Sequence, residues 1–170
     1  MRRLGPLWGP LSALTLSLAA LAFGFDQTHK WWMLQVYDIA QRQPVQALPF
    51  LDLVLAWNRG VSYGWFSSHG ALGQVVLIAI AVVVSAWLWR WAAQARRPLT
   101  ASALGLIIGG ALANGLDRAV HGAVADFFLL HWGLWSWYIF NIADVAVVAG
   151  VVLLVYDSFK DKEPRSAKRP

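Results

Sequence analysis

The chain has 170 residues, enough for one domain, with 58% apolar residues, 14% charged residues and a mean hydropathy of +0.51. This composition excludes an ordinary soluble domain, because such domains carry roughly 25% charged residues. The absence of cysteine excludes disulfides, thiolate nucleophiles and cysteine-based metal sites, and the net charge of +5 does not predict nucleic-acid binding, because most basic residues flank apolar segments.

Four apolar segments are close to the roughly 20 residues that a helix needs to cross a hydrocarbon core about 30 Å thick. They cover residues 7–25, 71–89, 99–116 and 139–156. We therefore predict an all-α membrane protein, a single integral membrane domain over residues 1–170, with four transmembrane helices.

The segment of residues 27–69, between the first two spans, predicts a small unit on the outer surface. Four of its apolar residues share one face of a short amphipathic helix that lies on the membrane: Met33, Val36, Tyr37 and Ala40. Residues 51–57 are typical of a strand, and residues 58–60 of a turn before residues 61–66. We expect a surface helix and a small β element here.

The basic residues predict the orientation, because Lys and Arg near span ends are retained in the cytoplasm. Ten of the fourteen lie on the side that both termini share: Arg2, Arg3, Arg90, Arg96, Arg97, Lys160, Lys162, Arg165, Lys168 and Arg169. We expect both termini in the cytoplasm, with residues 157–170 as a basic tail that contacts anionic lipid.

The first apolar segment also has a second interpretation. Arg2 and Arg3, the apolar stretch and Ala20-Leu21-Ala22 resemble a cleavable secretory signal. We expect the segment to be retained as a span. Cleavage would leave three spans and an outside N-terminus, and would still spare Asp26.

Six of the nine acidic residues lie on the outer side or at its membrane edge: Asp26, Asp38, Asp52, Asp117, Asp126 and Asp144. Ionisable groups at membrane depth face a protein interior or a wet cavity. Two carboxylates that share a site hold one proton between them. The charged member can then activate water while the protonated member supports a peptide carbonyl oxygen. A two-aspartate protease is therefore the favoured chemistry.

The spacing of the polar residues adds detail but leaves alternatives open. One face of a helix carries Asn114, Asp117 and Arg118 at i, i+3 and i+4, and Asn141 with Asp144 repeats the Asn-x-x-Asp spacing. Ion pairs of Asp117 with Arg118, and of Asp26 with Lys30, are the structural alternative. On spacing alone, Asp117 is as good a catalytic candidate as the other aspartates.

Other functions are less consistent with the pattern. The sequence has no His-x-x-x-His pair and no Gly-x-Ser-x-Gly elbow. A Ser-Lys hydrolase stays open, with Lys30 as base and Ser62 or Thr28 as nucleophile, as do a small carrier and a non-enzymatic scaffold. Gly105 and Gly109 form a Gly-x-x-x-Gly motif that predicts tight helix packing.

Five stretches carry short motifs in a fixed order: Asp26–Lys30 (Asp-x-x-x-Lys), Asn58–Gly64 (Asn-x-Gly), Gly109–Arg118 (Gly-Gly-x-x-x-Asn-x-x-Asp-Arg), Val124–Phe127 (Val-x-Asp-Phe) and Phe140–Asp144 (Phe-Asn-x-Ala-Asp). Together they resemble signal peptidase II, the lipoprotein signal peptidase family. The chain departs from the family at Val61-Ser62-Tyr63, where Ala-Ala-Phe is common, and in its tryptophan-rich residues 129–137, for which membrane anchoring or a deeper lid is our interpretation.

The resemblance implies a catalytic dyad of Asp126 and Asp144, with no metal or other cofactor. It further implies a set of residues that bind substrate or support the site: Asn114, Arg118, Asn141, Asn58, Gly60, Asp26, Lys30 and Asp117. It implies a periplasmic β cradle and a site at the periplasmic face of the bacterial inner membrane. The substrates would be diacylglyceryl-modified prolipoproteins, cut just before the lipidated cysteine, with membrane lipids as further partners. A monomer suffices for this chemistry.

Overall fold

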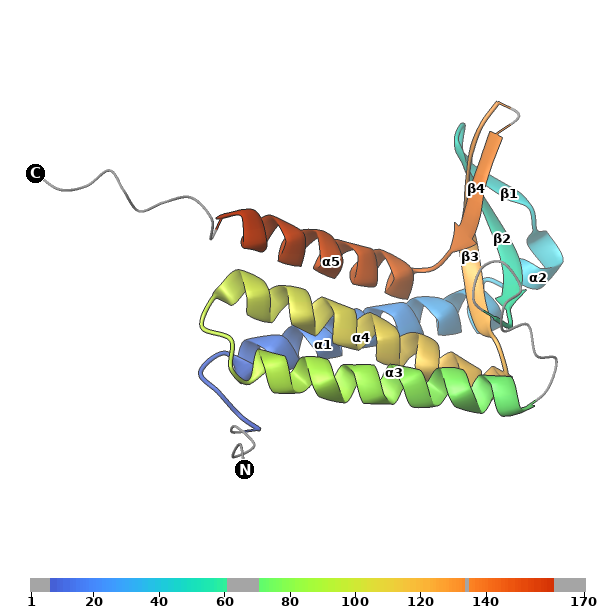
Figure 1. Ribbon diagram of the computed structural model, residues 1–170. Coiled ribbons are helices and arrows are strands. Elements are labelled where there is room, and N and C mark those ends of the chain that lie inside the picture. Colours follow the sequence, from blue (N-terminus) through green and yellow to red (C-terminus); the bar gives the residue numbers. More distant parts are fainter. Residues whose placement is uncertain (1–6, 61–70, 134, 161–170) are drawn as a thin grey trace, which may run out of the picture.

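The computed structural model describes residues 7–60, 71–133 and 135–160. Four long helices run side by side, with a small sheet at one end of the bundle (Figure 1): α1 (Ser12–Trp31), α3 (Ala71–Ala92), α4 (Pro98–His121) and α5 (Ile142–Lys160). Helix α1 starts and α5 ends at the opposite end of the bundle. Helix α4 is central, because α1, α3 and α5 each pack against it.

Local signals in the sequence explain where α4 and α5 begin. Helix α4 begins at Pro98, where the missing N–H of proline costs no helical hydrogen bond, and ends before Gly122, whose φ is +68°. Before α5, Asn141 Oδ1 accepts the backbone N–H of Asp144 at 2.9 Å, and Asp144 Oδ2 accepts the N–H of Asn141 at 3.2 Å. This reciprocal pair is a capping box, so the Asn-x-x-Asp spacing marks the start of α5.

Glycines allow α4 to approach its neighbours closely, as the Gly-x-x-x-Gly motif predicts. A Cβ on Gly105 would lie 2.6 Å from the carbonyl oxygen of Thr15 on α1. A Cβ on Gly110 would lie 2.5 Å from the carbonyl oxygen of Ala143 on α5. Helix α4 therefore contacts two neighbours at backbone distance, and one of these contacts is next to Asp144.

We expect Gly105→Ala to lower the free energy of unfolding by about 1–3 kcal/mol, because the added methyl group overlaps α1. Gly24 is the matched control on α1, since a Cβ there meets no atom within 4 Å. Gly24→Ala should be neutral or stabilise the helix by up to about 1 kcal/mol. Thermal unfolding in detergent, followed by circular dichroism, measures both changes, and equal melting temperatures would contradict this packing argument.

The sheet contains four antiparallel strands in the order β1-β2-β3-β4: β1 (Val45–Leu48), β2 (Leu51–Asn58), β3 (Val124–Trp132) and β4 (Trp135–Phe140). Strand β2 agrees with the predicted strand over residues 51–57, whereas residues 61–66 lie outside the described residues. Strands β3 and β4 form a hairpin from the tryptophan-rich stretch, and β4 leads directly into α5 (Figure 1).

The predicted amphipathic surface helix does not form as one element. A π-helical turn, η1 (Trp32–Val36), continues α1, and the backbone then turns at Asp38, whose φ is 51°. The short helix α2 (Ile39–Arg42) follows. Met33 and Ile39 are both buried and pack in one cluster with residues of β3. Of the four residues that predicted contact with lipid, Met33 is buried in this cluster and Tyr37 packs against it, whereas Val36 is 54% exposed and Ala40 is exposed.

Two of the predicted spans need correction at their ends. The first was predicted over residues 7–25, but its helix begins at Ser12 and continues past Asp26. The charged side chains of Asp26 and Lys30 can lie inside the protein because they form a buried ion pair. The fourth, residues 139–156, starts too early, because Ile139 belongs to β4. A short apolar run does not distinguish a strand from a helix. The predicted 71–89 and 99–116 lie inside the longer α3 and α4.

Among the described helices, α3, α4 and α5 are long and apolar enough to cross a membrane, by length and composition. Helix α1 is not in that set. The protein is therefore a mostly helical chain with at least these candidate spans and a small antiparallel sheet.

Candidate active site

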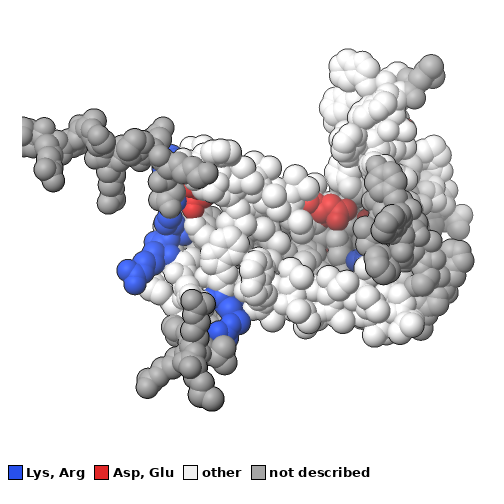
Figure 2. Space-filling model, viewed as in Figure 1, with Lys and Arg blue, Asp and Glu red and all other residues white. Residues whose placement is uncertain are grey.

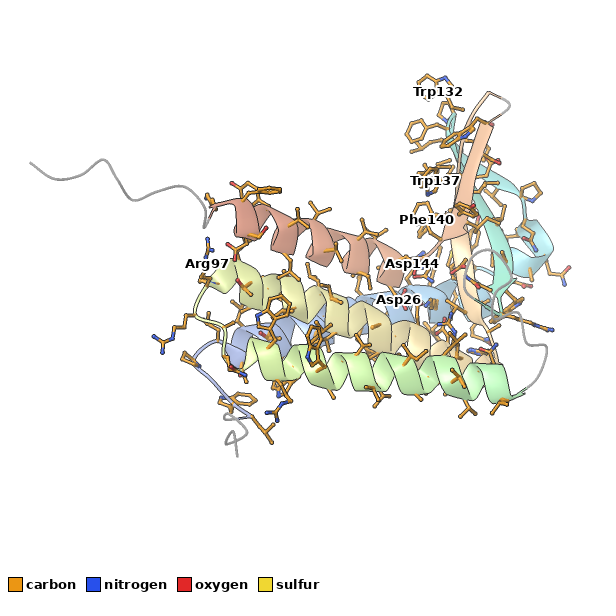
Figure 3. All side chains as sticks on the ribbon, in the orientation of Figure 1. Asp26, Arg97, Trp132, Trp137, Phe140 and Asp144 are labelled. Carbon is orange, nitrogen blue, oxygen red and sulfur yellow. The ribbon has the colours of Figure 1, made fainter. Side chains whose placement is uncertain are left out.

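Two carboxylates from different elements meet where the sheet joins the helices. Asp126 lies on β3 and is only 2% exposed, while Asp144 lies in the first turn of α5 and is half-buried. They are near enough for the charge of Asp144 to act on Asp126. Figure 3 shows Asp144 at the start of α5, below the sheet. The pair thus combines one buried and one more accessible carboxylate.

The surroundings of Asp126 favour its protonated form. Burial raises the pKa of Asp126 to about 6, and the negative charge of Asp144 acts in the same direction. Hydrogen bonds from Asn141 and Asn58, and the positive charge of Lys30, act against this rise. Asp126 therefore keeps its proton to a higher pH than an ordinary aspartic acid does.

Two asparagines direct their amide N–H groups toward Asp126. Asn58 Oδ1 accepts the backbone N–H of Gly60 at 3.2 Å, and Asn58 Nδ2 donates to Asp126 Oδ2 at 3.2 Å. Asn141 Oδ1 accepts the N–H of Asp144, and Asn141 Nδ2 donates to Asp126 Oδ1 at 2.6 Å. Because a backbone N–H can only donate, it fixes which end of each amide faces the carboxylate. Both oxygens of Asp126 therefore receive a hydrogen bond.

Asn114, on α4, has the same relation to Asp144. Its Oδ1 accepts hydrogen bonds from Lys30 Nζ and from Asn141 Nδ2, each at 3.1 Å, and its Nδ2 donates to Asp144 Oδ1 at 2.9 Å. Arg118 donates to the carbonyl oxygen of Asn114 at 3.2 Å. Since an ammonium group can only donate, Lys30 fixes the direction of the Asn114 amide. Lys30 thus acts on Asp144 through Asn114.

Lys30 is buried between two carboxylates. Its Nζ lies 2.8 Å from Asp26 Oδ2 and 2.8 Å from Asp117 Oδ2, so with the asparagine oxygen it has an acceptor for each of its three N–H groups. A lysine engaged in this way is poorly suited to the role of neutral base in a Ser-Lys pair. Of the two nucleophiles considered, Thr28 is exposed on α1, and Ser62 lies outside the described residues.

The same two carboxylates hold the backbone beside the candidate dyad. Asp117 Oδ2 accepts the N–H of Ala125 at 3.2 Å, and Asp26 Oδ1 accepts the N–H of Ala143 at 2.8 Å. These alanines directly precede Asp126 and Asp144 in the chain. The spacing left open an ion pair of Asp117 with Arg118, but the carboxylate of Asp117 pairs with Lys30 instead.

Sequence reasoning missed one member of this cluster, Gln27. Its Nε2 donates to Asp117 Oδ1 at 2.8 Å and to Asp26 Oδ2 at 3.2 Å, and so links α1 to α4. The only signal in the sequence was its position beside Asp26, in the first of the five stretches. An amide that joins two carboxylates reduces their repulsion, because it donates to both.

A family model and individual relatives both match this sequence, and they give the same family. The family model described as "Signal peptidase (SPase) II" matches residues 18–160. The chain is 49% identical over 152 residues to a lipoprotein signal peptidase of Nitrobacter hamburgensis, covering 87% of this chain and 92% of that one. It is 50% identical over 149 residues to that of Methylorubrum extorquens, covering 88% and 86%.

The fold also has solved neighbours. A bacterial membrane enzyme solved at 2.3 Å superimposes with a TM-score of 0.77 at 24% identity, covering 93% of this chain and 94% of that one. A second, solved at 1.9 Å, gives a TM-score of 0.74 at 23% identity. The neighbours establish the fold, and the family model together with the close relatives establishes that this bacterial membrane protein belongs to the signal peptidase II family.

Proposed function

We propose that this protein is an aspartic endopeptidase, in which Asp126 and Asp144 form the catalytic dyad. It would remove the signal peptide from diacylglyceryl-modified prolipoproteins by cleaving just before the lipidated cysteine. The observation that carries the proposal is the pair itself: a buried and a half-buried carboxylate that interact electrostatically, each held by asparagines of fixed direction.

The pair has the properties that peptide hydrolysis requires. Two interacting carboxylates share one proton, so one member is charged and the other neutral. The charged member takes a proton from water, whose oxygen attacks the carbonyl carbon, while the neutral member donates to the carbonyl oxygen. Collapse of the tetrahedral intermediate breaks the C–N bond, and the amine leaves with a proton returned by the dyad. The two groups titrate together, so we assign these roles to the pair.

The other predicted residues would position this pair. Asn58, Asn114 and Asn141 hold its oxygens, and Gly60 fixes Asn58. Arg118 lines the groove that reaches Asp144. The buried Asp26, Lys30 and Asp117 form a structural support behind the site. Asp26, Lys30 and Asp117 do not need to touch the reacting atoms.

We further propose that α1 is retained as a fourth span, which makes residues 1–170 a single integral membrane domain. It packs along α4 (Figure 1), and its 20 residues match the 19 of α5. Most of the Lys and Arg side chains visible in Figure 2 gather at the end of the bundle away from the sheet. This asymmetry favours cytoplasmic termini in the bacterial inner membrane. The sheet would then form the periplasmic cradle, and the dyad would lie beside it at the outer face of the membrane. A substrate held by its lipid and signal helix would present its scissile bond at that level.

The purified protein in detergent is expected to shorten a diacylglyceryl-modified prolipoprotein by its signal peptide. Mass spectrometry of the product should show lipidated cysteine as the new N-terminal residue. The unmodified precursor, incubated in parallel, is the matched control and should remain intact. Cleavage at another bond, or equal cleavage of both precursors, would refute the proposed specificity. Full activity of a Ser62→Ala variant is expected, and its inactivity would favour the Ser-Lys mechanism.

A further inference from the structure

Two separate grooves meet at Asp144. One, of about 370 Å³, lies between α3, α4 and α5 and is lined by Asn114, Arg118 and the stretch of α3 from Leu77 to Val84. The other, of about 440 Å³, lies between the β3–β4 hairpin and α5. Asp144 and Val148 line both. The accessible member of the candidate dyad therefore stands on the ridge between two binding surfaces.

The second groove, which we name the hairpin groove, is lined by Leu130, Trp137 and Phe140 of the hairpin and by Val145, Val148 and Ala149 of α5, with Asp144 at its edge. Figure 3 shows Trp132, Trp137, Phe140 and Asp144 in a row from the hairpin tip to the start of α5. Trp137 is 53% exposed and Val148 61% exposed, so much apolar surface is open to an occupant.

The two grooves differ in shape in a way that suits the two parts of the substrate. The α3–α4–α5 groove follows α3 for about two turns, in the direction of the helices, as a transmembrane signal helix would. The hairpin groove covers only the first turns of α5 and ends under β4, at the level where the sheet begins. Its lining is hydrocarbon and aromatic except for Asp144, so it offers an occupant apolar contact almost alone.

We propose that the hairpin groove binds an acyl chain of the lipidated cysteine, and that Trp137 determines the enzyme's preference for long acyl chains. The inference rests on the proposed function, because it assigns one half of that substrate. The scissile bond joins the signal segment to the lipidated cysteine, and Asp144 lies between the two grooves, so each side of the bond faces one groove. The acyl chain would move from the lipid bilayer into a groove of fixed shape. Its binding there would hold the lipidated cysteine in position for hydrolysis.

The test uses the full chain and two synthetic prolipoprotein peptides, whose cysteine carries either long (sixteen-carbon) or short (eight-carbon) acyl chains. For the wild type, kcat/KM should be about tenfold higher for the long-chain peptide, a difference of roughly 1.4 kcal/mol. Trp137→Ala should bring this ratio close to one through a higher KM for the long-chain peptide. Trp137→Phe should largely retain the ratio, and Ala149→Leu, which fills the groove, should lower it. Trp132→Ala, on the same hairpin but outside the groove lining, should leave it unchanged.

The outcomes separate this proposal from the one on which it rests. An unchanged ratio in both Trp137→Ala and Ala149→Leu would overturn the acyl-chain assignment, and so would an equal loss of activity on both peptides, which indicates a membrane or folding contact. In either case, cleavage of both peptides by the wild type would still support the proposed endopeptidase function. If the wild type cleaves neither peptide, the proposed function itself fails.

Discussion

Replacing either Asp126 or Asp144 with asparagine is expected to lower kcat by roughly 10³-fold, because the dyad loses the proton transfer that activates water. The substitution keeps the size of each side chain, and the remaining amide oxygen can still accept one of the hydrogen bonds that the carboxylate received. Release of the signal peptide from a lipid-modified prolipoprotein, followed by gel shift, measures the effect. Each variant should remain folded, which size-exclusion chromatography and thermal unfolding will show.

Asp117→Asn is the matched comparator, because Asp117 is equally buried but engages Lys30 and the N–H of Ala125. We expect it to lower the melting temperature and to retain measurable activity, since its effect on the dyad is indirect. If Asp126→Asn or Asp144→Asn cleaves at nearly the wild-type rate, the dyad mechanism is wrong. If Asp117→Asn alone is inactive while folded, the catalytic assignment moves to Asp117.

The pH dependence has a definite sign. Burial raises the pKa of Asp126 to about 6, so the singly protonated pair exists below that pH and is lost as pH rises through it. Since kcat/KM reports the free enzyme, it should fall on the alkaline side with an apparent pKa of about 6 that belongs to the pair. The ionised form of Asp126 is also disfavoured in the fold, so Asp126→Asn should not reduce thermal stability above pH 6. A flat profile from pH 5 to 9 would be inconsistent with this argument.

Lys30→Met is expected to lower the free energy of unfolding by about 3–5 kcal/mol, because it leaves two buried carboxylates without their cation. Asp26 is 0% and Asp117 2% exposed, so water cannot replace the lost ion pairs without opening the structure. The variant also removes one of the two donors to Asn114 Oδ1, which weakens the hold on the amide that donates to Asp144. Denaturant unfolding in mild detergent measures the stability, and gel shift the activity of the folded fraction.

The ion pair at the opposite end of the bundle provides the control. Arg97 Nη2 lies 2.8 Å from Asp157 Oδ1, but the Arg97 side chain is 40% exposed, and Figure 3 shows Arg97 far from Asp144. Arg97→Met should therefore cost less stability than Lys30→Met and leave kcat unchanged. Equal losses from the two variants would mean that burial of the Lys30 cluster is not what stabilises this end of the protein.

The sequence predicted which polar residues lie close together better than it predicted the elements that carry them. The spacing of Asn141 and Asp144 is a capping box as well as a family motif, and it lies at the start of α5, although the predicted span began at residue 139. The choice of Asp126 over Asp117 came from the family resemblance, because local spacing does not predict contacts with residues that are distant in the sequence. Lys30, eighty-seven positions away, forms the ion pair that favours a structural role for Asp117.

The tryptophan-rich hairpin shows why the rest could not be predicted. Residues 129–137 contain apolar and aromatic side chains without a clear period, which suits a strand, a buried helix or a membrane anchor equally. Their pairing depends on β2, far earlier in the chain, where Leu51 faces Leu130 and Asp52 faces Leu129. Similarly, Met33 belongs to the predicted face of a surface helix, but it is buried against residues of β3. Long-range pairing decided both cases.

The fixed direction of the three asparagine amides has a consequence for inhibitor chemistry. Asn58, Asn114 and Asn141 already direct their N–H groups to the dyad and cannot present an oxygen there. A carboxylate or phosphonate placed between the two aspartates would be repelled by the negative charge of the ionised member. A neutral hydroxyl group, by contrast, can donate to the ionised aspartate and accept from the protonated one. Compounds that carry such a hydroxyl beside an apolar chain therefore match this site in both polarity and shape.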